Sequence, residues 1–243
     1  MYLSVVIPAY NEEHRILPTL ARFDEWLLAQ GRPYEILVTD DGSMDGTVDR
    51  VRAFGQDHPA VRVLPHAERR NQGKGHALKR VMGETSGAFV LYTDADLPVD
   101  PAALPWFLGP LETGECDLTI ASRWVNGAPS PDDVPAGRAF VSKSFRLLMR
   151  PFVLNGVADT QCGFKAFRGD VARQLFAQLT IDRFAFDVEL IYLAQRAGYR
   201  IKEVPVRIHH ADGSTVRPVR DSLDTLRDLA RIKWNDQRGQ YDP

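Results

Sequence analysis

The chain has 243 residues, of which 44% are hydrophobic and 26% are charged, so it is long enough to bury one substantial hydrophobic core. Its formal net charge of −2 argues against a nucleic-acid-binding protein, because a positively charged surface supplies most of the affinity for nucleic acids. The two cysteines, Cys116 and Cys162, are far apart in the sequence, and this spacing predicts neither a disulfide framework nor a zinc site.

The cysteine usage fits a reducing, cytoplasmic location. The N-terminal stretch MYLSVVIPAYNEE has no basic region followed by a long apolar region, and no apolar run in the chain is long enough to span a bilayer. We therefore expect neither a signal peptide nor a transmembrane helix.

Short β-branched segments alternate with longer amphipathic segments along the first half of the chain. Strands are predicted at 3–9, 34–40, 60–65, 88–94 and 116–122. Helices are predicted between them at 12–31, 45–56 and 73–87. This alternation favours right-handed crossovers and a parallel sheet, and the nearly continuous apolar character of the strands predicts burial of both sheet faces.

The regular alternation ends after residue 123. The segment 126–138 is rich in Pro and Gly and predicts a long functional loop. Helices are predicted at 139–150, 169–179, 186–197 and 219–234, with one further strand at 201–208. No linker or repeat is evident, so the pattern predicts a single Rossmann-like α/β domain with a mostly parallel central sheet flanked by helices.

Acidic residues follow two of the predicted strands: Asp40 and Asp41 end the second, and Asp94 and Asp96 end the fourth. Ligands of open parallel sheets bind beyond the carboxyl ends of the strands, so we expect these side chains at one edge. Carboxylates gathered without cations raise one another's pKa, whereas Mg²⁺ or Mn²⁺ binds carboxylate and phosphate oxygens together. A lone Asp-x-Asp is more often a solvated turn, but the second acidic pair favours a metal and diphosphate site.

Four motifs, VVIPAYNEE, VTDDGSMDGT, RNQGKGHALKRVM and YTDADLP, occur in this order. Together they resemble the inverting family 2 nucleotide-sugar glycosyltransferases, which have the GT-A fold. The later motifs SRWVNG, DTQCGFKAF and FAFDVELIYLA resemble more narrowly the polyprenyl-phosphate branch, with its dolichyl-phosphate β-glucosyltransferases and mannosyl relatives.

The resemblance implies an Mg²⁺- or Mn²⁺-dependent transfer of a hexose to a polyprenyl or dolichyl phosphate. UDP-glucose is favoured as donor over GDP-mannose, and a lipid acceptor implies peripheral contact with the inner face of the membrane. Within one domain spanning 1–243, residues 1–122 are expected to bind the nucleotide sugar and 123–218 to bind the acceptor and carry catalysis. Residues 219–243 are expected to form a C-terminal helix and tail.

The resemblance also assigns the nucleotide and sugar contacts. They are Pro8, Ala9, Tyr10, Glu12, Asp40, Asp41, Lys74, Asp94 and Ala95. Asp41 is expected to accept hydrogen bonds from the base, and Asp94 to contact the sugar or ribose. Lys74 and the free N–H groups at the start of its helix are expected to face an anion.

The expected catalytic residues are Asp96, Asp159 and Asp187. Asp96 is expected to hold the metal against the diphosphate. If the acceptor is a hydroxyl, Asp159 or Asp187 must take its proton as general base, whereas an ionised phosphate needs no strong base. The structural alternatives are a turn or cap residue for Asp159, and an N-cap or first-turn acid for Asp187.

Two arginines, Arg123 and Arg138, are predicted to bind the acceptor phosphate, because a guanidinium pairs with phosphate oxygens bidentately. The basic, apolar helix 139–150 fits either an interfacial helix or a core helix with a basic edge. Pro98 stands where some mannosyl relatives have a ligating glutamine, which leaves the third protein ligand of the metal open. A loop at 208–218 could close over the diphosphate, and His209, in preference to His210, is predicted to complete the metal shell.

Two other functions remain open. A soluble sugar or a small phosphorylated molecule could replace the lipid acceptor, as the absent transmembrane segment favours. A non-catalytic nucleotide-sugar-binding protein is disfavoured by the joint presence of Asp41, Asp94, Asp96 and Asp159.

Overall fold

The computed structural model describes residues 1–66, 70–125, 156–207 and 218–242. The predicted loop 126–138 and helix 139–150 lie outside these ranges. So do the predicted acceptor-binding Arg138 and the predicted metal ligand His209.

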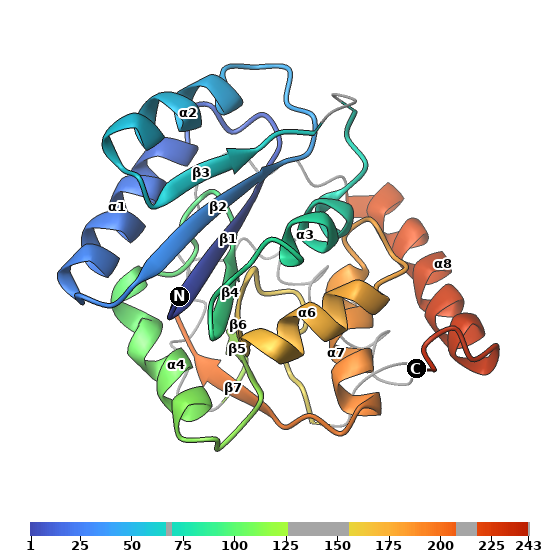
Figure 1. Cartoon of the computed structure of the whole chain (residues 1–243). Helices are drawn as coiled ribbons and strands as arrows, with labels where there is room; N and C mark the ends of the chain where they lie inside the picture. The colour runs from blue at the N-terminus through green and yellow to red at the C-terminus, as the bar shows by residue number, and fades with distance from the viewer. Residues whose placement is uncertain (67–69, 126–155, 208–217, 243) are drawn as a thin grey trace.

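Within the described ranges, the strands form one seven-stranded sheet in the order β3-β2-β1-β4-β6-β5-β7. The strands are β1 (Leu3–Ala9), β2 (Tyr34–Asp40), β3 (Val61–Leu64), β4 (Phe89–Thr93), β5 (Leu118–Ser122), β6 (Phe164–Arg168) and β7 (Ile201–Pro205). Adjacent strands are parallel except at β6, which runs antiparallel to both β4 and β5. The sheet lies at the centre of the molecule, between two layers of helices (Figure 1).

One layer contains α1 (Ile16–Ala29), α2 (Thr47–Asp57), the 3-10 helix η1 (Pro101–Ala103) and α4 (Leu104–Glu112). The other contains α3 (Lys74–Met82), α6 (Gly169–Gln178), α7 (Phe186–Arg196) and α8 (Pro218–Gln237), seen on the right in Figure 1. Alternate strand residues face opposite layers: Val5 and Ile7 pack with Leu20, whereas Val6 packs with Leu78. In the described part of the chain, no helix has the length and hydropathy needed to cross a membrane.

The sequence prediction of a mostly parallel α/β fold is confirmed. β1 and β2 have the predicted bounds, and the other predicted elements within the described ranges are present with shifted ends. Three elements were not predicted: η1, α4 and β6. Helix α4 carries Pro105 near its start and Pro110 inside it, and these prolines obscured the apolar spacing of Leu104, Phe107, Leu108 and Leu111. Strand β6 has five residues with a lysine in the second position, so it does not resemble a central strand. The division of the domain into halves remains a prediction.

A fully buried lysine lies on the central strand β6. Lys165 is opposite Tyr92 of β4 in the antiparallel register, so both side chains project towards the α7 layer. The Lys165 ammonium donates to Asp187 of α7 (2.5 Å), to the Tyr92 hydroxyl (2.6 Å) and to the carbonyl of Cys162 (2.8 Å). The Tyr92 hydroxyl also donates to Asp187. These contacts satisfy the three ammonium protons of a cation that has no access to water.

We predict that Lys165→Met destabilises the fold by about 3–5 kcal/mol, because it leaves the buried Asp187 carboxylate without its counter-ion. Lys202→Met is the matched control. Lys202 is also a strand lysine paired with an acid, Glu115, but both side chains are exposed, so its loss should cost no more than about 1 kcal/mol. Urea unfolding of the two variants checks the prediction, and equal losses would contradict it.

Candidate functional site

The loops that follow β1 and β2 are hydrogen-bonded to each other. The backbone N–H of Asn11 donates to the Ser43 hydroxyl (2.9 Å), and that of Glu12 donates to the Thr47 hydroxyl (2.8 Å). The Asn11 side-chain oxygen in turn accepts from the Met44 N–H (2.9 Å). Asn11 has a left-handed backbone with φ of 56°, a conformation that asparagine tolerates better than most residues.

This pairing brings together residues that the sequence predicted to bind the nucleotide. Ala9 pairs with Asp40 in the β1–β2 register, and the Asp41 N–H donates to the Ala9 carbonyl (2.9 Å). Pro8 precedes them on β1, and the exposed Tyr10 ring follows directly. These residues therefore lie next to one another at the carboxyl ends of β1 and β2.

The carboxylates of Asp40 and Asp41 are both hydrogen-bonded to backbone N–H groups. Asp40 accepts from Gly42 and Ser43 and so holds the loop after β2. Asp41 accepts from Gln72 (3.0 Å) and Gly73 (2.8 Å), which lead into α3. Burial raises the pKa of Asp41 in spite of these bonds. A base-binding role for Asp41 stays a prediction, since each carboxylate oxygen can accept a second hydrogen bond.

The expectation of free N–H groups at the start of α3 is wrong for Gln72 and Gly73, because Asp41 occupies them. The sharp turn there requires glycine. Gly73 has φ of +120°, and a Cβ at this position would lie 2.3 Å from the carbonyl oxygen of Asp182. The loop before α3 is therefore packed directly against the loop before α7.

Lys74, at the first position of α3, pairs with Asp94. Its ammonium lies 2.5 Å from Asp94 Oδ1 and also lies over the rings of Tyr92 and Phe186, at 5.5 and 5.7 Å from their centroids. Burial lowers the pKa of Lys74, but the charges of Asp94 and Asp187 outweigh it and leave the pKa raised. Lys74 is therefore a fixed cation at the sugar end of the predicted site.

Asp96 differs from the other acids of this edge because its Oδ1 is buried and has no hydrogen-bond partner. Burial raises the pKa of Asp96, and the charge of Asp94 raises it further. Burial also raises the pKa of Glu12, against the effect of its ion pair with Arg15 (2.7 Å), and the charges of Asp96 and Asp94 add to the increase. A divalent cation would remove this repulsion, and carboxylate oxygens are the ligands that Mg²⁺ and Mn²⁺ prefer.

The two neighbours of Asp96 in its turn both have distinctive features. The Ala95 carbonyl accepts from the buried Thr19 hydroxyl of α1 (2.7 Å), and Leu97 has a left-handed φ of 52°. A leucine in this conformation stores strain, which is most often kept at functional sites. Among the described residues, no three His, Cys, Asp or Glu side chains already form a complete metal site. Metal binding by Asp96 therefore stays a prediction.

Arg123 and Asp159, predicted for acceptor binding and catalysis, form a bidentate ion pair. Arg123 donates to Asp159 from Nε (2.7 Å), from the terminal NH2 group (2.9 Å) and from its backbone N–H (3.1 Å). Glu203 of β7, which the sequence did not single out, accepts from the backbone N–H groups of Ala158 (2.9 Å) and Asp159 (3.0 Å). Only the pairing of β5 with β7 brings Glu203 here, so its position in the sequence gave no signal.

Asp187 lies in the first turn of α7, whose N-cap is Ala185, so the first-turn alternative holds and the N-cap alternative does not. Its carboxylate is buried and accepts from Lys165 and Tyr92. Asp187 is thus part of the buried cluster beneath Lys74, and a direct catalytic role stays a prediction.

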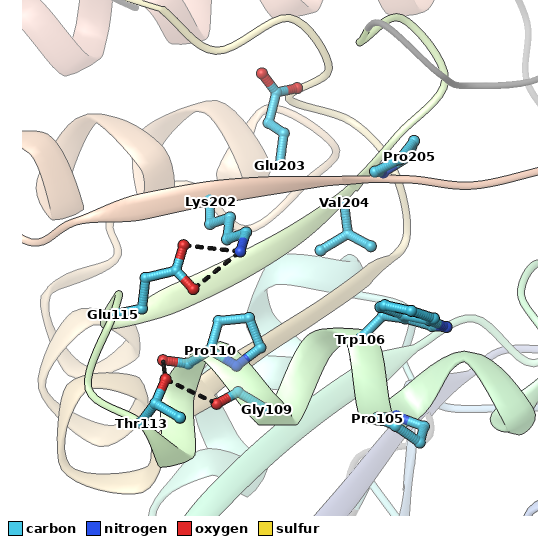
Figure 2. Close-up of a pocket in the computed structure, with 10 residues that line it drawn as sticks. All are labelled: Pro105, Trp106, Gly109, Pro110, Thr113, Glu115, Lys202, Glu203, Val204 and Pro205. Carbon is cyan, nitrogen blue, oxygen red and sulfur yellow. Dashed lines mark hydrogen bonds and ion pairs between the residues drawn. The ribbon is translucent and has the colours of Figure 1, made fainter.

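A groove of about 630 Å³ lies elsewhere, between α4 and the edge strand β7. Pro105, Trp106 and Val204 are among its lining residues, and the exposed ion pair of Lys202 with Glu115 lies at one end. Figure 2 shows Lys202 and Val204 directed towards α4 and Glu203 directed to the opposite side of β7. None of the predicted site residues lines this groove.

Comparison with known proteins agrees with the fold. Residues 4–176 match the family model described as Glycosyl transferase family 2. The chain is 39% identical over 249 residues to a dolichyl-phosphate beta-glucosyltransferase of Drosophila melanogaster, covering 95% of this chain and 74% of that protein. It is 32% identical over 246 residues to the Dictyostelium discoideum protein of the same name, covering 96% and 74%.

A solved structure with the same fold is glucosyl-3-phosphoglycerate synthase from Mycobacterium tuberculosis, in complex with Mn²⁺, UDP and phosphoglyceric acid. The TM-score is 0.68 at 26% identity, over 99% of this chain and 78% of that one. The same enzyme has been solved with Mn²⁺, UDP-glucose and phosphoglyceric acid, with a TM-score of 0.70 at 25% identity over 95% and 79% of the two chains.

We predict that Asp96→Asn stabilises the metal-free protein at neutral pH. The raised pKa of Asp96 means that its ionised form is disfavoured in the folded state. This cost is absent below the unfolded-state pKa of about 4 and reaches its full value once the pH exceeds the folded-state pKa. Thermal unfolding in the presence of a chelator should therefore show that Asp96→Asn is more stable than wild type at pH 7. This difference in stability should disappear near pH 4. A variant less stable than wild type at both pH values would contradict it.

Proposed function

The chain belongs to glycosyl transferase family 2, and from this membership we propose that it transfers glucose from UDP-glucose to a dolichyl or polyprenyl phosphate, with inversion at the anomeric carbon. Support for the acceptor comes from the dolichyl-phosphate beta-glucosyltransferases, which match at 32 and 39% identity along nearly the whole chain. GDP-mannose is the alternative donor that the motifs leave open.

The donor half of the reaction uses the edge formed by the loops after β1, β2 and β4. We assign Asp41, Pro8 and Tyr10 to the nucleotide, and the Lys74–Asp94 pair to the sugar or ribose. Asp96 Oδ1, buried without a partner, fits a divalent cation, as do the raised pKa values of Asp96 and Glu12. The Mn²⁺ in the related synthase structures supports the choice of a divalent ion.

When bound, Mn²⁺ or Mg²⁺ would neutralise the charge that develops on the departing nucleoside diphosphate. The protein's own residues supply the rest. Lys74 places a positive charge beside the carboxylate of Asp94, 2.5 Å from its Oδ1, and so holds this carboxylate in position. The rigid turn at 95–97 keeps Asp96 in position before the substrate arrives, which lowers the cost of assembling the site.

Within the structure, the observation that supports a phosphate acceptor is that both general-base candidates are held in ion pairs. Asp159 is 4% exposed and is bound by Arg123, and Asp187 is 4% exposed and is bound by Lys165. Either acid would have to give up a buried ion pair to accept a proton, at a considerable cost in free energy. An ionised phosphate oxygen attacks without transferring a proton, so it makes no such demand.

A small phosphorylated acceptor is the second candidate, because the structural neighbour contains phosphoglyceric acid in its complexes. If the sugar is passed to a hydroxyl of such a molecule, a general base is required. Asp159 is then the better candidate, since it borders the partly exposed Arg123, whereas Asp187 lies behind Lys74 and Tyr92.

A polyprenyl chain resides in a lipid bilayer, so the main proposal requires peripheral contact with a membrane. We assign this contact to residues outside the described ranges. Arg138, the second arginine proposed to bind the acceptor phosphate, also lies outside these ranges. Both assignments, like the cytoplasmic side of the membrane, stay predictions.

The direct test is an assay with UDP-glucose and GDP-mannose, Mn²⁺ or Mg²⁺, and either a short-chain polyprenyl phosphate or phosphoglyceric acid. We expect glucosyl transfer to the polyprenyl phosphate that chelators abolish. Asp96→Asn should lower the rate at least about 100-fold, because metal stabilisation of the transition state amounts to several kcal/mol. Transfer only to phosphoglyceric acid would move the second candidate to first place.

The pH dependence separates the acceptors independently. With a lipid phosphate, kcat/KM should fall below about pH 6, where the phosphate gains its second proton. The position of this acidic limb should be the same in Asp159→Asn, even if the variant is slower overall. A limb that disappears or shifts in the variant would identify Asp159 as a general base and would contradict the base-free reaction.

A further inference from the structure

Asp94 lies opposite Gly163, across the pairing of β4 with β6. The register places Tyr92 opposite Lys165 and Thr93 opposite Phe164, and the Asp94 N–H continues it by donating to the Gly163 carbonyl (3.1 Å). Residues two apart on a strand face the same side. Asp94 and Gly163 therefore extend the sheet face that carries Tyr92 and Lys165.

The carboxylate of Asp94 occupies the space that a side chain at position 163 would fill. A Cβ on Gly163 would lie 2.0 Å from Asp94 Oδ2 and 2.5 Å from Asp94 Cγ. Gly163 is not among the residues with positive φ, so its backbone conformation is open to alanine. The three atoms nearest to such a Cβ all belong to the Asp94 carboxylate, so this group is the main obstacle to a side chain at position 163.

This glycine differs from others in the fold. At Gly73 and Gly75 the nearest obstacles are backbone carbonyl oxygens of Asp182 and Ile181, at 2.3 and 2.5 Å, which cannot move without shifting a loop. At Gly163 the obstacle is the end of a side chain that can rotate. Alanine at 163 is therefore compatible with folding, and the strain is relieved by displacing Asp94.

The backbone of the segment that carries Gly163 is held in place by hydrogen bonds. The buried Lys165 ammonium donates to the carbonyl of Cys162, the neighbouring residue, while its other protons bind Tyr92 and Asp187. The Gly163 carbonyl is in turn held by the Asp94 N–H. Gly163 thus cannot retreat from Asp94, and the position of the carboxylate against Lys74 is determined by the backbone at 163.

We propose that Gly163 is a positioning residue for donor binding: its missing side chain lets the Asp94 carboxylate lie between β6 and the Lys74 ammonium, 2.5 Å from Lys74 Nζ. The inference rests on the proposed function in taking Asp94 as the sugar or ribose contact. The Gly163→Ala substitution should leave the fold intact, break the Lys74–Asp94 contact and weaken donor binding.

The experiment compares Gly163→Ala with Gly83→Ala. Gly83 ends α3 and has a helical φ of −66°, and a Cβ added there would meet no neighbouring atom within 4 Å. This control therefore adds the same methyl group without a contact. Crystal structures give the Lys74–Asp94 distance, thermal unfolding gives stability, and titration with UDP-glucose in the presence of Mn²⁺ gives donor affinity.

We expect Gly163→Ala to remain folded with a modest fall in unfolding temperature, because the Lys74–Asp94 contact is lost. The Kd for UDP-glucose should rise at least about tenfold, as the loss of one hydrogen bond to a charged group does. Gly83→Ala should keep the Lys74–Asp94 contact and the wild-type Kd, and it should unfold at the same or a slightly higher temperature than wild type, because alanine suits its helical backbone. In an Asp94→Ala background, adding Gly163→Ala should change the Kd by less than about twofold, because the two residues act through one carboxylate.

A Gly163→Ala structure that keeps the Lys74–Asp94 contact overturns the inference, and so does a loss of affinity that persists fully in the Asp94→Ala background. If the wild-type protein does not bind UDP-glucose at all, the proposed function fails instead. The crystal structures then still decide whether Gly163 determines the position of Asp94.

Discussion

The structure depends on one buried ion pair, between Lys165 in the central antiparallel strand and Asp187 in α7. Both side chains are removed from water, so each requires the other, and Tyr92 hydrogen-bonds to both. The pair fixes α7 against the sheet, and α7 with Tyr92 supplies the aromatic surface under Lys74. The acidic edge of the site therefore lies next to a buried cluster in which Lys165 and Asp187 neutralise each other.

Above that layer, most acids of the site have a partner in the protein. Asp94 pairs with Lys74, Asp159 with Arg123, Glu12 with Arg15, and Asp40 and Asp41 accept backbone N–H groups. Asp96 differs from these acids, because its Oδ1 is buried and has no hydrogen-bond partner. Without a bound cation, the partly buried Asp96 carboxylate lowers the stability of the folded protein. Binding sites commonly show this trade-off between stability and function.

The same balance bears on the chemistry. A family 2 glycosyltransferase must stabilise a departing nucleoside diphosphate and admit an acceptor from the opposite side of the sugar. Here the two acids predicted as general bases, Asp159 and Asp187, are held in ion pairs, whereas Asp96 has a buried oxygen without a partner. Under the proposed function, this difference suits an acceptor that needs no general base.

The sequence by itself determined the mostly parallel α/β fold and the edge at which Asp41, Asp94 and Asp96 meet, because β-strands, crossovers and the convergence of strand ends follow from local pattern and chain order. It also assigned the family, since an ordered series of motifs is specific. Only the tertiary structure revealed the antiparallel β6, the buried Lys165, the support of Asp159 by Glu203, and the contact of Gly163 with Asp94. These features arise from pairing between segments tens of residues apart, where a glycine or a lysine acquires its role from its neighbour across the sheet and carries no local signal of it.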